Sequence, residues 1–156
     1  MSEAVQPVFT IEKIYVKDLS LEMPNAPQIF NEREAPQVEV NFHTAGRAID
    51  SGVYEVVVTV TLTAKIQDKT MFLIEIGQAG VFQIRNVPAN DIDPMLGVHC
   101  PNILFPYLRE AVASVSSRAG LPPVQLQPMS FEPLYQAQLA ERQKQAGAAP
   151  APTTVQ

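Results

Sequence analysis

The sequence predicts an α+β protein built on an antiparallel sheet, and two observations carry that prediction. Strand-like patterns come first along the chain and helical patterns come last, an order typical of α+β folds. The longest strand-like pattern fills residues 53–84 and has the form of a single hairpin. Its alternation is the strongest structural signal in the chain.

Residues 53–66 alternate with a period of two and are rich in β-branched side chains, which indicates a half-buried strand. A polar turn at residues 67–69 precedes a returning strand at residues 70–78. At roughly 3.3 Å per residue the first strand would reach about 45 Å, so its apolar face needs more cover than this chain supplies. The hairpin therefore predicts an assembly of several chains. The apolar face carries Tyr54, Val56, Val58, Val60, Leu62, Ala64 and Ile66, and the returning strand adds Phe72, Ile74 and Ile76.

Two short strands and a proline-rich crossover are predicted before the hairpin. We expect residues 1–7 to form a flexible arm and residues 8–16 a strand. Residues 17–30 cannot stay regular for long, because Pro24 and Pro27 lack backbone donors and favour extended geometry in the residues before them. Residues 38–42 predict a short strand, and residues 44–52 predict turns. Gly77 and Gly80 predict a bulge or a close backbone approach late in the hairpin.

A loop and two helices are predicted after the hairpin. Pro94 suits a short helical turn, and Pro106 suits the first position of a helix that runs to about Arg118. Ser130 is the expected N-cap of a second helix. Residues 146–156 are low in complexity and are expected to be disordered, which leaves residues 8–145 as the folded domain.

Length and charge exclude several classes of protein. A chain of 156 residues makes one domain, and its net charge of -5 disfavours nonspecific binding to nucleic acid. The N-terminus MSEAVQPVF lacks the pattern of a signal peptide, and no apolar run approaches the length of a membrane span. The single cysteine excludes an internal disulfide and fits a reducing compartment. We expect a soluble, cytoplasmic protein that binds no nucleic acid and does not insert into membranes.

The sequence offers little for catalysis. Neither a phosphate-binding loop nor a dinucleotide-binding turn is present. His99 and Cys100 are the only His–Cys neighbours, and with His43 as the one other histidine a structural zinc site is implausible. Cys100 as a nucleophile with His43 as its base is a minor alternative to a small buried thiol. We therefore expect a protein that is not an enzyme, with no catalytic residue, metal or cofactor.

Two features allow two interpretations each. Asp18, Glu22 and Glu75 are either solvated surface charges or one acidic patch that docks a basic partner. The apolar crossover at residues 19–30 is either a lid over the core or a groove wall that presents apolar groups to extended peptides. If the crossover is only core, the protein is an oligomeric scaffold or adaptor.

Four segments resemble the SecB family of bacterial protein-export chaperones, in order and with sensible spacing. They are IYVKDLSLEMPNAPQIF at residues 14–30, GQAGVFQI at 77–84, HCPNILFPYLRE at 99–110 and LPPVQLQPMSFEPLY at 121–135. The resemblance covers about residues 8–140. Leu21 departs from the family, in which many members carry Phe.

The resemblance implies a subunit with a four-stranded antiparallel sheet and two helices, assembled as a dimer of dimers. It also implies an ATP-independent holdase that binds unfolded precursor proteins, keeps them competent for export and delivers them to the motor SecA. A SecA-docking surface would comprise Asp18, Glu22, Leu73 and Glu75. The client-peptide groove would be lined by Leu21, Pro24, Pro27, Phe30, Val38, Val40, Phe42, Phe131 and Tyr135.

Overall fold

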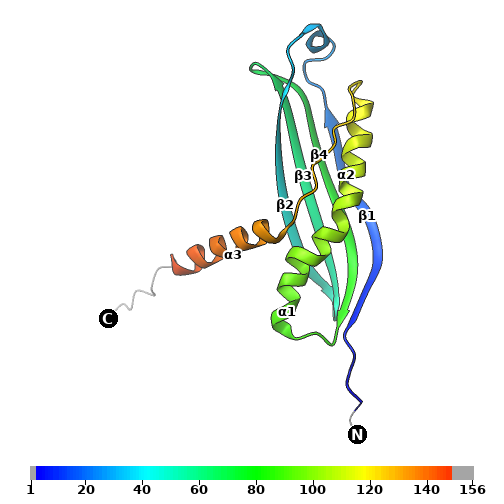
Figure 1. Cartoon of the computed structure of the whole chain (residues 1–156), viewed down its shortest axis with the longest axis vertical. Helices are drawn as coiled ribbons and strands as arrows, with labels where there is room; N and C mark the ends of the chain where they lie inside the picture. The colour runs from blue at the N-terminus through cyan, green and yellow to red at the C-terminus, as the bar shows by residue number, and fades with distance from the viewer. Residues whose placement is uncertain (1–2, 149–156) are drawn as a thin grey trace, which may run out of the picture.

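One antiparallel sheet of four strands organises the fold, and the long helix at residues 100–118 lies across one of its faces (Figure 1). The computed structural model describes residues 3–148 of the chain. The strand order is β1-β4-β3-β2, so β1 and β2 form the two edges. These observations confirm the predicted fold class. The strands are β1 (Val8–Glu22), β2 (Gln37–Asp50), β3 (Val53–Ile66) and β4 (Lys69–Arg85), and the helices are α1 (Ala89–Pro94), α2 (Cys100–Arg118) and α3 (Glu132–Gly147), with a 3-10 helix at Gln28–Asn31 and a π-helical turn at Met95–His99.

The predicted hairpin is confirmed as β3 and β4, which pair along their whole length. The side chains that alternation assigned to the apolar face of β3 are buried from Val56 to Ile66, and so are Phe72, Ile74 and Ile76 of β4. The turn between the strands uses only Gln67 and Asp68, and the positive φ of Gln67, 55°, lets it close tightly. The period of two was thus sufficient to place the core of the sheet.

The two edge strands are longer than predicted. β1 continues through the first residues of the expected crossover to Glu22, and β2 continues through the predicted turns to Asp50. Both predictions were wrong because each edge strand pairs along a long neighbour, and ladder hydrogen bonds outweigh weak local turn signals. The chain turns only at Ser51 and Gly52, where a φ of 68° favours glycine.

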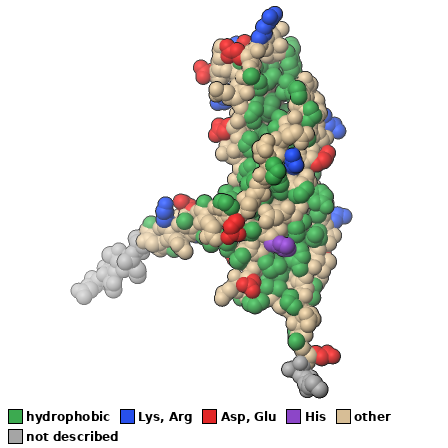
Figure 2. All heavy atoms as spheres, in the orientation of Figure 1, with side chains coloured by type: hydrophobic (Ala, Val, Ile, Leu, Met, Phe, Trp, Pro, Cys, Tyr) green, Lys and Arg blue, Asp and Glu red, His purple; other side chains and the backbone are tan. Residues whose placement is uncertain are grey.

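The two faces of the sheet differ in their cover, and we name them the helix face and the open face. Val58 and Leu62 of β3 point to the helix face and share a core with Leu104 and Leu108 of α2. Gly80 of β4 points the same way, because a Cβ placed on it would lie 3.0 Å from Leu104. Directly paired residues on neighbouring strands point to the same side, so the register assigns each paired strand residue to a face. Figure 2 views the helix face and shows hydrophobic side chains gathered along it.

The first long helix begins earlier than predicted. α2 starts at Cys100 with Pro101 in its first turn, and Pro106 lies inside the helix. Prolines at 94, 101 and 106 are each compatible with a first turn, so the sequence could not choose among them. The predicted end at Arg118 is confirmed, and Gly120 follows with a φ of 78°.

The last helix projects away from the sheet (Figure 1). The N-cap of α3 is Phe131 and not Ser130 as predicted, because the helix begins one residue later. Ser130 Oγ still accepts a hydrogen bond from the backbone N–H of Glu132 at 3.3 Å. α3 continues to Gly147, so the first two residues of the segment predicted as a disordered tail are helical. Ala148 follows as the C-cap of α3. Residues 149–156 of the predicted tail and the first two residues of the predicted arm lie outside the described residues.

Candidate interaction surfaces

The four residues of the expected docking surface lie together on the open face. Glu22 pairs with Leu73, and Glu75 stands two residues further along β4 on the same side. A Cβ placed on Gly77 would lie 3.6 Å from the Cβ of Asp18, which sets Asp18 beside the same strand. The three carboxylates are exposed and Leu73 is half-buried. We name this set the acidic patch; its docking role stays a prediction.

β1 contains two extra residues, Glu12 and Lys17, and the second decides which of the side chains after it reach the open face. Val16 pairs with Gln78 and Asp18 pairs with Gly77, so Lys17 is inserted into β1 without a partner on β4. A bulge of this kind reverses the facing of every residue that follows it. It therefore turns the acidic residues of β1 to the open face and the leucines that alternate with them to the helix face.

Leu19 and Leu21, the leucines that face the helices, border a hollow between β1 and α2. Val16, Leu19 and Leu21 line one side of it, and Val115 and Arg118 are among the α2 residues on the other. Its volume is about 390 Å³. Leu21, which was expected in the client groove, thus lies at the β1 edge of the sheet. The other predicted strand members of the groove lie at the β2 edge, so the structure does not join all nine residues into one surface.

Beside the acidic patch, the open face carries a buried carboxylate that the sequence analysis missed. Glu55 of β3 is only 6% exposed, although alternation placed it on the polar side of the strand. Its carboxylate accepts hydrogen bonds from Lys17 Nζ at 2.7 Å, from Arg47 Nε at 3.2 Å and from the Tyr15 hydroxyl. We name these four residues the Glu55 cluster. No spacing in the sequence signals it, because its members come from β1, β2 and β3.

The hydrogen bonds within this cluster shift the pKa values of Glu55 and Tyr15. Hydrogen bonds from Lys17 and Tyr15 lower the pKa of Glu55 from 4.5 to about 2, against a smaller opposing effect of burial. The hydrogen bond to Glu55 raises the pKa of Tyr15. Glu55 therefore stays ionised and Tyr15 stays protonated at neutral pH. One carboxylate faces two cations, so the cluster keeps a net positive charge next to the acidic patch.

At the opposite edge, β2 presents apolar side chains to the helix face. Val38 is 43% exposed and Val40 is 38% exposed, which leaves both available to a ligand. Phe42 follows on the same side and is half-buried, with its ring centroid 6.3 Å from that of Phe105 and 6.4 Å from that of Phe131. The β2 edge therefore offers a short apolar strip that ends on an aromatic cluster.

Phe131 and Tyr135 were expected in the groove wall, and the structure places them in the interior instead. Phe131 has no exposed surface and Tyr135 is 8% exposed. The Tyr135 hydroxyl donates a hydrogen bond to Asp93 at 2.8 Å, and its ring packs so closely on Gly97 that a Cβ there would lie 2.4 Å away. Both residues pack at the start of α3, and their place in a client groove stays a prediction.

The crossover between β1 and β2 is partly a lid and partly a surface. Ile29 is 2% exposed and belongs to the core, whereas the adjacent Phe30 is 49% exposed. Asn25 donates a hydrogen bond to the Thr70 carbonyl at 2.9 Å, which ties the crossover to the tip of the hairpin. Pro24 and Pro27, the remaining groove residues, are exposed on this segment. The lid interpretation therefore holds for Ile29, and the groove-wall interpretation stays a prediction for the exposed side chains.

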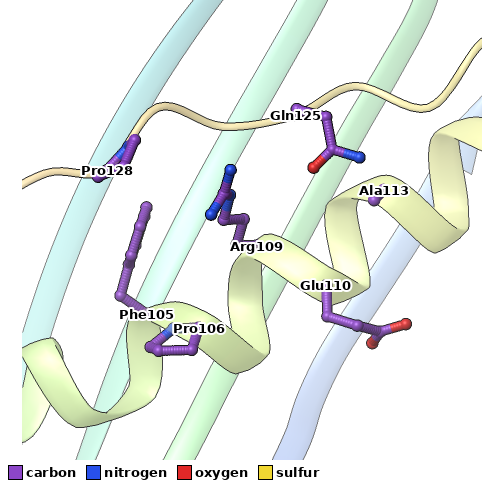
Figure 3. A pocket seen from close by; sticks show the side chains of 7 residues that line it. All are labelled: Phe105, Pro106, Arg109, Glu110, Ala113, Gln125 and Pro128. Carbon is purple, nitrogen blue, oxygen red and sulfur yellow. The ribbon is translucent and has the colours of Figure 1, made fainter.

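A further hollow of about 580 Å³ lies between α2 and the segment that leads to α3 (Figure 3). Phe105 and Arg109 rise towards that segment, and Gln125 descends from it. The Nε of Arg109 is buried without a hydrogen-bond partner among the described residues. No pattern in the sequence predicts this hollow, because it depends on how the segment after α2 folds back. Its other lining residues are Pro106, Glu110, Ala113 and Pro128.

The one cysteine is part of the core. Cys100 has no exposed surface, and burial raises the pKa of its thiol from 9.0 to about 12. His43, the only candidate base considered, pairs with Thr59 on the open face, on the other side of the sheet. A thiol that stays protonated and lies apart from its base cannot act as a nucleophile. Within residues 3–148, no group of three or more acidic, cysteine or histidine side chains could hold a metal ion.

Comparison with known proteins defines the class. A family model described as "Preprotein translocase subunit SecB" matches residues 2–142. The protein-export protein SecB of Dechloromonas aromatica is 59% identical over 156 residues, which cover the whole of both chains. That of Methylobacillus flagellatus is 61% identical over 143 residues, covering 92% of this chain and 91% of the relative. These relatives are protein-export chaperones rather than enzymes.

The fold agrees with that class. The solved structure of a SecB-like chaperone of Mycobacterium tuberculosis, in complex with a peptide from an antitoxin, superposes with a TM-score of 0.66. It is 19% identical in sequence and is matched over 78% of this chain and 91% of that chain, so it supports the fold alone. The chain belongs to the SecB family. None of the helices in its described part is both long and apolar enough to cross a lipid bilayer.

Proposed function

We propose that this chain is the subunit of an ATP-independent export chaperone that holds unfolded precursor proteins in the cytoplasm and delivers them to the motor SecA. Family membership gives the class, and one observation carries the holding function. Val38 and Val40 are exposed on the helix face beside Phe42, whose ring lies in an aromatic cluster, and Phe30 is exposed on the crossover. Large apolar side chains grouped in this way are typical of an interaction site.

Holding requires contacts that tolerate many sequences. Apolar side chains supply them, because burial of apolar area does not depend on a particular partner sequence. Each contact made by Phe30 or Val38 would be weak. Several such contacts on one unfolded chain add through effective concentration, so the total binding is tight. A client that folds hides its apolar segments and leaves.

We propose that the functional form is a dimer of dimers. β1 is an edge strand, and Val16 and Leu19 on it are 46% and 49% exposed beside the hollow along α2. An exposed apolar edge is a liability in a free subunit and a natural contact in an assembly. A second copy on this edge would provide the cover that the long sheet lacks. It would also change the surroundings of Leu21, which borders the same hollow.

The acidic patch is the proposed SecA-docking surface. Its three carboxylates attract a basic segment over distance, and the half-buried Leu73 supplies a contact that can be fully desolvated on docking. The patch lies on the open face, whereas Val38 and Val40 point to the helix face. Holding and delivery would therefore use opposite sides of one sheet.

Aggregation of an unrelated denatured protein tests the holding function. The assembled chaperone should suppress light scattering by a chemically denatured client on dilution, without ATP. A Val38→Asp, Val40→Asp double variant should suppress less, because charges replace apolar contacts at the β2 edge. The matched control is Glu39→Ala, which lies between them and points to the open face. If both variants hold clients as well as the wild type does, the scaffold interpretation is favoured.

A further inference from the structure

We propose that Lys17 and Glu55 are positioning residues, which hold the bulge in β1 and so keep Asp18 and Glu22 on the open face for docking. The inference rests on the proposed function of the acidic patch. It concerns residues that need not contact SecA at all. The observations that carry it are the register of β1, the contacts of the Glu55 cluster and the small residues that β4 places beneath it.

The cluster spans the sheet at the point where β1 changes its facing. Lys17 is the inserted residue of the bulge, and its Nζ lies 2.7 Å from Glu55 on β3. β4 runs between these strands, and there it carries Gly77 and Ala79 on the open face. Because neither has a long side chain, Lys17 can reach over β4. The inserted residue is thus held by a buried carboxylate two strands away.

A second contact secures the residues just before the insertion. Gln78, which is 3% exposed, donates a hydrogen bond from Nε2 to the backbone carbonyl of Tyr15 at 3.1 Å. The hydroxyl of the same Tyr15 bonds to Glu55. A bulge disrupts the ladder locally and leaves its extra residue unpaired, so it persists only where other contacts favour it. Here Lys17 and the Tyr15 hydroxyl both bind Glu55, and Gln78 holds the backbone of Tyr15.

Loss of the bulge would change more than one contact. If β1 slipped by one residue to remove the insertion, every side chain beyond it would change face. Asp18 and Glu22 would turn towards the helix face, and Leu19 would turn to the open face. Even a partly populated slip would lower the fraction of molecules competent to dock, and the apparent affinity would fall by that fraction.

If Lys17 holds the bulge, removing it should change SecA binding in the direction opposite to that expected from its charge alone. Lys17 is a positive charge beside an acidic patch that is proposed to bind a basic segment. If Lys17 acted only through its charge, its removal would strengthen docking. If Lys17 holds the bulge, its removal weakens docking. Lys13 is the matched control, since it is exposed on the same strand and on the same face. It pairs with Val81 of β4, which in turn pairs with Glu55 of β3. Lys13 forms no ion pair with any residue of the described chain.

The experiment compares SecA binding by Lys17→Met, Lys17→Arg and Lys13→Met chaperones, all checked for unchanged assembly. We expect Lys17→Met to weaken binding by about fivefold or more, Lys17→Arg to restore most of it, and Lys13→Met to leave it unchanged or slightly tighter. Tyr15→Phe removes a hydrogen bond to Glu55 without changing any charge. Tyr15→Phe should therefore also weaken SecA binding, but by less than Lys17→Met does.

A second readout needs no partner. Backbone hydrogen exchange should quicken at Asp18 and Leu19 in Lys17→Met, while the β3–β4 hairpin stays protected as in the wild type. Weaker SecA binding without faster exchange would mean that Lys17 contacts SecA directly. Faster exchange with unchanged SecA binding would mean that the bulge does not govern docking. Either result overturns the inference. If Glu75→Lys leaves SecA binding intact, the proposed docking surface itself fails, whatever the exchange data show.

Discussion

Replacing Leu73 by alanine tests the docking surface most directly. Leu73 is half-buried on the open face, with Glu22 paired beside it on β1 and Thr63 on β3. Leu73 is not part of the hydrophobic core, to which Phe72, Ile74 and Ile76 of β4 contribute from the helix face. The substitution should therefore leave folding and assembly intact. What it removes is apolar surface that a docked partner would cover.

The size of the effect follows from that surface. Leucine exceeds alanine by three carbon atoms, and each buried methylene contributes about 0.8 kcal/mol. Because Leu73 is already half-buried before docking, we expect a loss of about 1–1.5 kcal/mol, which weakens binding by about tenfold. The loss should appear mainly as faster dissociation.

Binding to SecA should be measured by calorimetry or surface-based kinetics at low and high salt. The weakening caused by Leu73→Ala should persist at high salt, whereas that caused by Glu75→Gln should shrink as salt screens the charges. Val81→Ala is the matched control, because Val81 is half-buried on the same strand and face but outside the acidic patch. Equal weakening by Leu73→Ala and Val81→Ala, or loss of client holding in either, would refute separate surfaces for docking and holding.

Other expectations concern assembly, the groove, the thiol and the buried carboxylate. Light scattering should give the mass of a tetramer at micromolar concentration; a monomer would contradict the proposed assembly. Phe30→Ala and Phe42→Ala should weaken client holding while assembly survives, and failure of both variants to assemble would favour a core lid. Cys100→Ser should keep both assembly and holding, since the thiol is buried with a pKa of about 12; loss of holding in assembled protein would restore a chemical role. Glu55→Gln should lower the free energy of unfolding at pH 7 by an amount on the order of 1–3 kcal/mol. Because folding lowers the pKa of Glu55 from 4.5 to about 2, its contribution is complete above pH 4.5 and disappears as the pH falls towards 2. Denaturation of both proteins across that range checks this, and a difference that did not shrink would contradict it.

Some of the fold could be predicted because its signals are local. The β3–β4 hairpin is specified by alternation within each strand, and the end of α2 by Arg118 and the glycine that soon follows. The starts of helices were less certain, since three prolines each suited a first turn. The acidic patch was predicted from family resemblance, and the structure brings its four residues onto one face. The nine groove residues do not all lie together. Leu21 lies at the β1 edge of the sheet and Val38 at the β2 edge, and Phe131 is buried.

The sequence alone determined the fold class, the long hairpin, the burial of Cys100 and the family. Tertiary structure decided the length of the edge strands, the burial of Glu55 and the facing of Asp18 and Glu22. The physical reason is the range of the contacts involved. Alternation reports burial only while the register is unbroken. The inserted residue Lys17 breaks the register and reverses which face the side chains after it take. That insertion is held by a carboxylate 38 positions further along the chain, so no local pattern could reveal it.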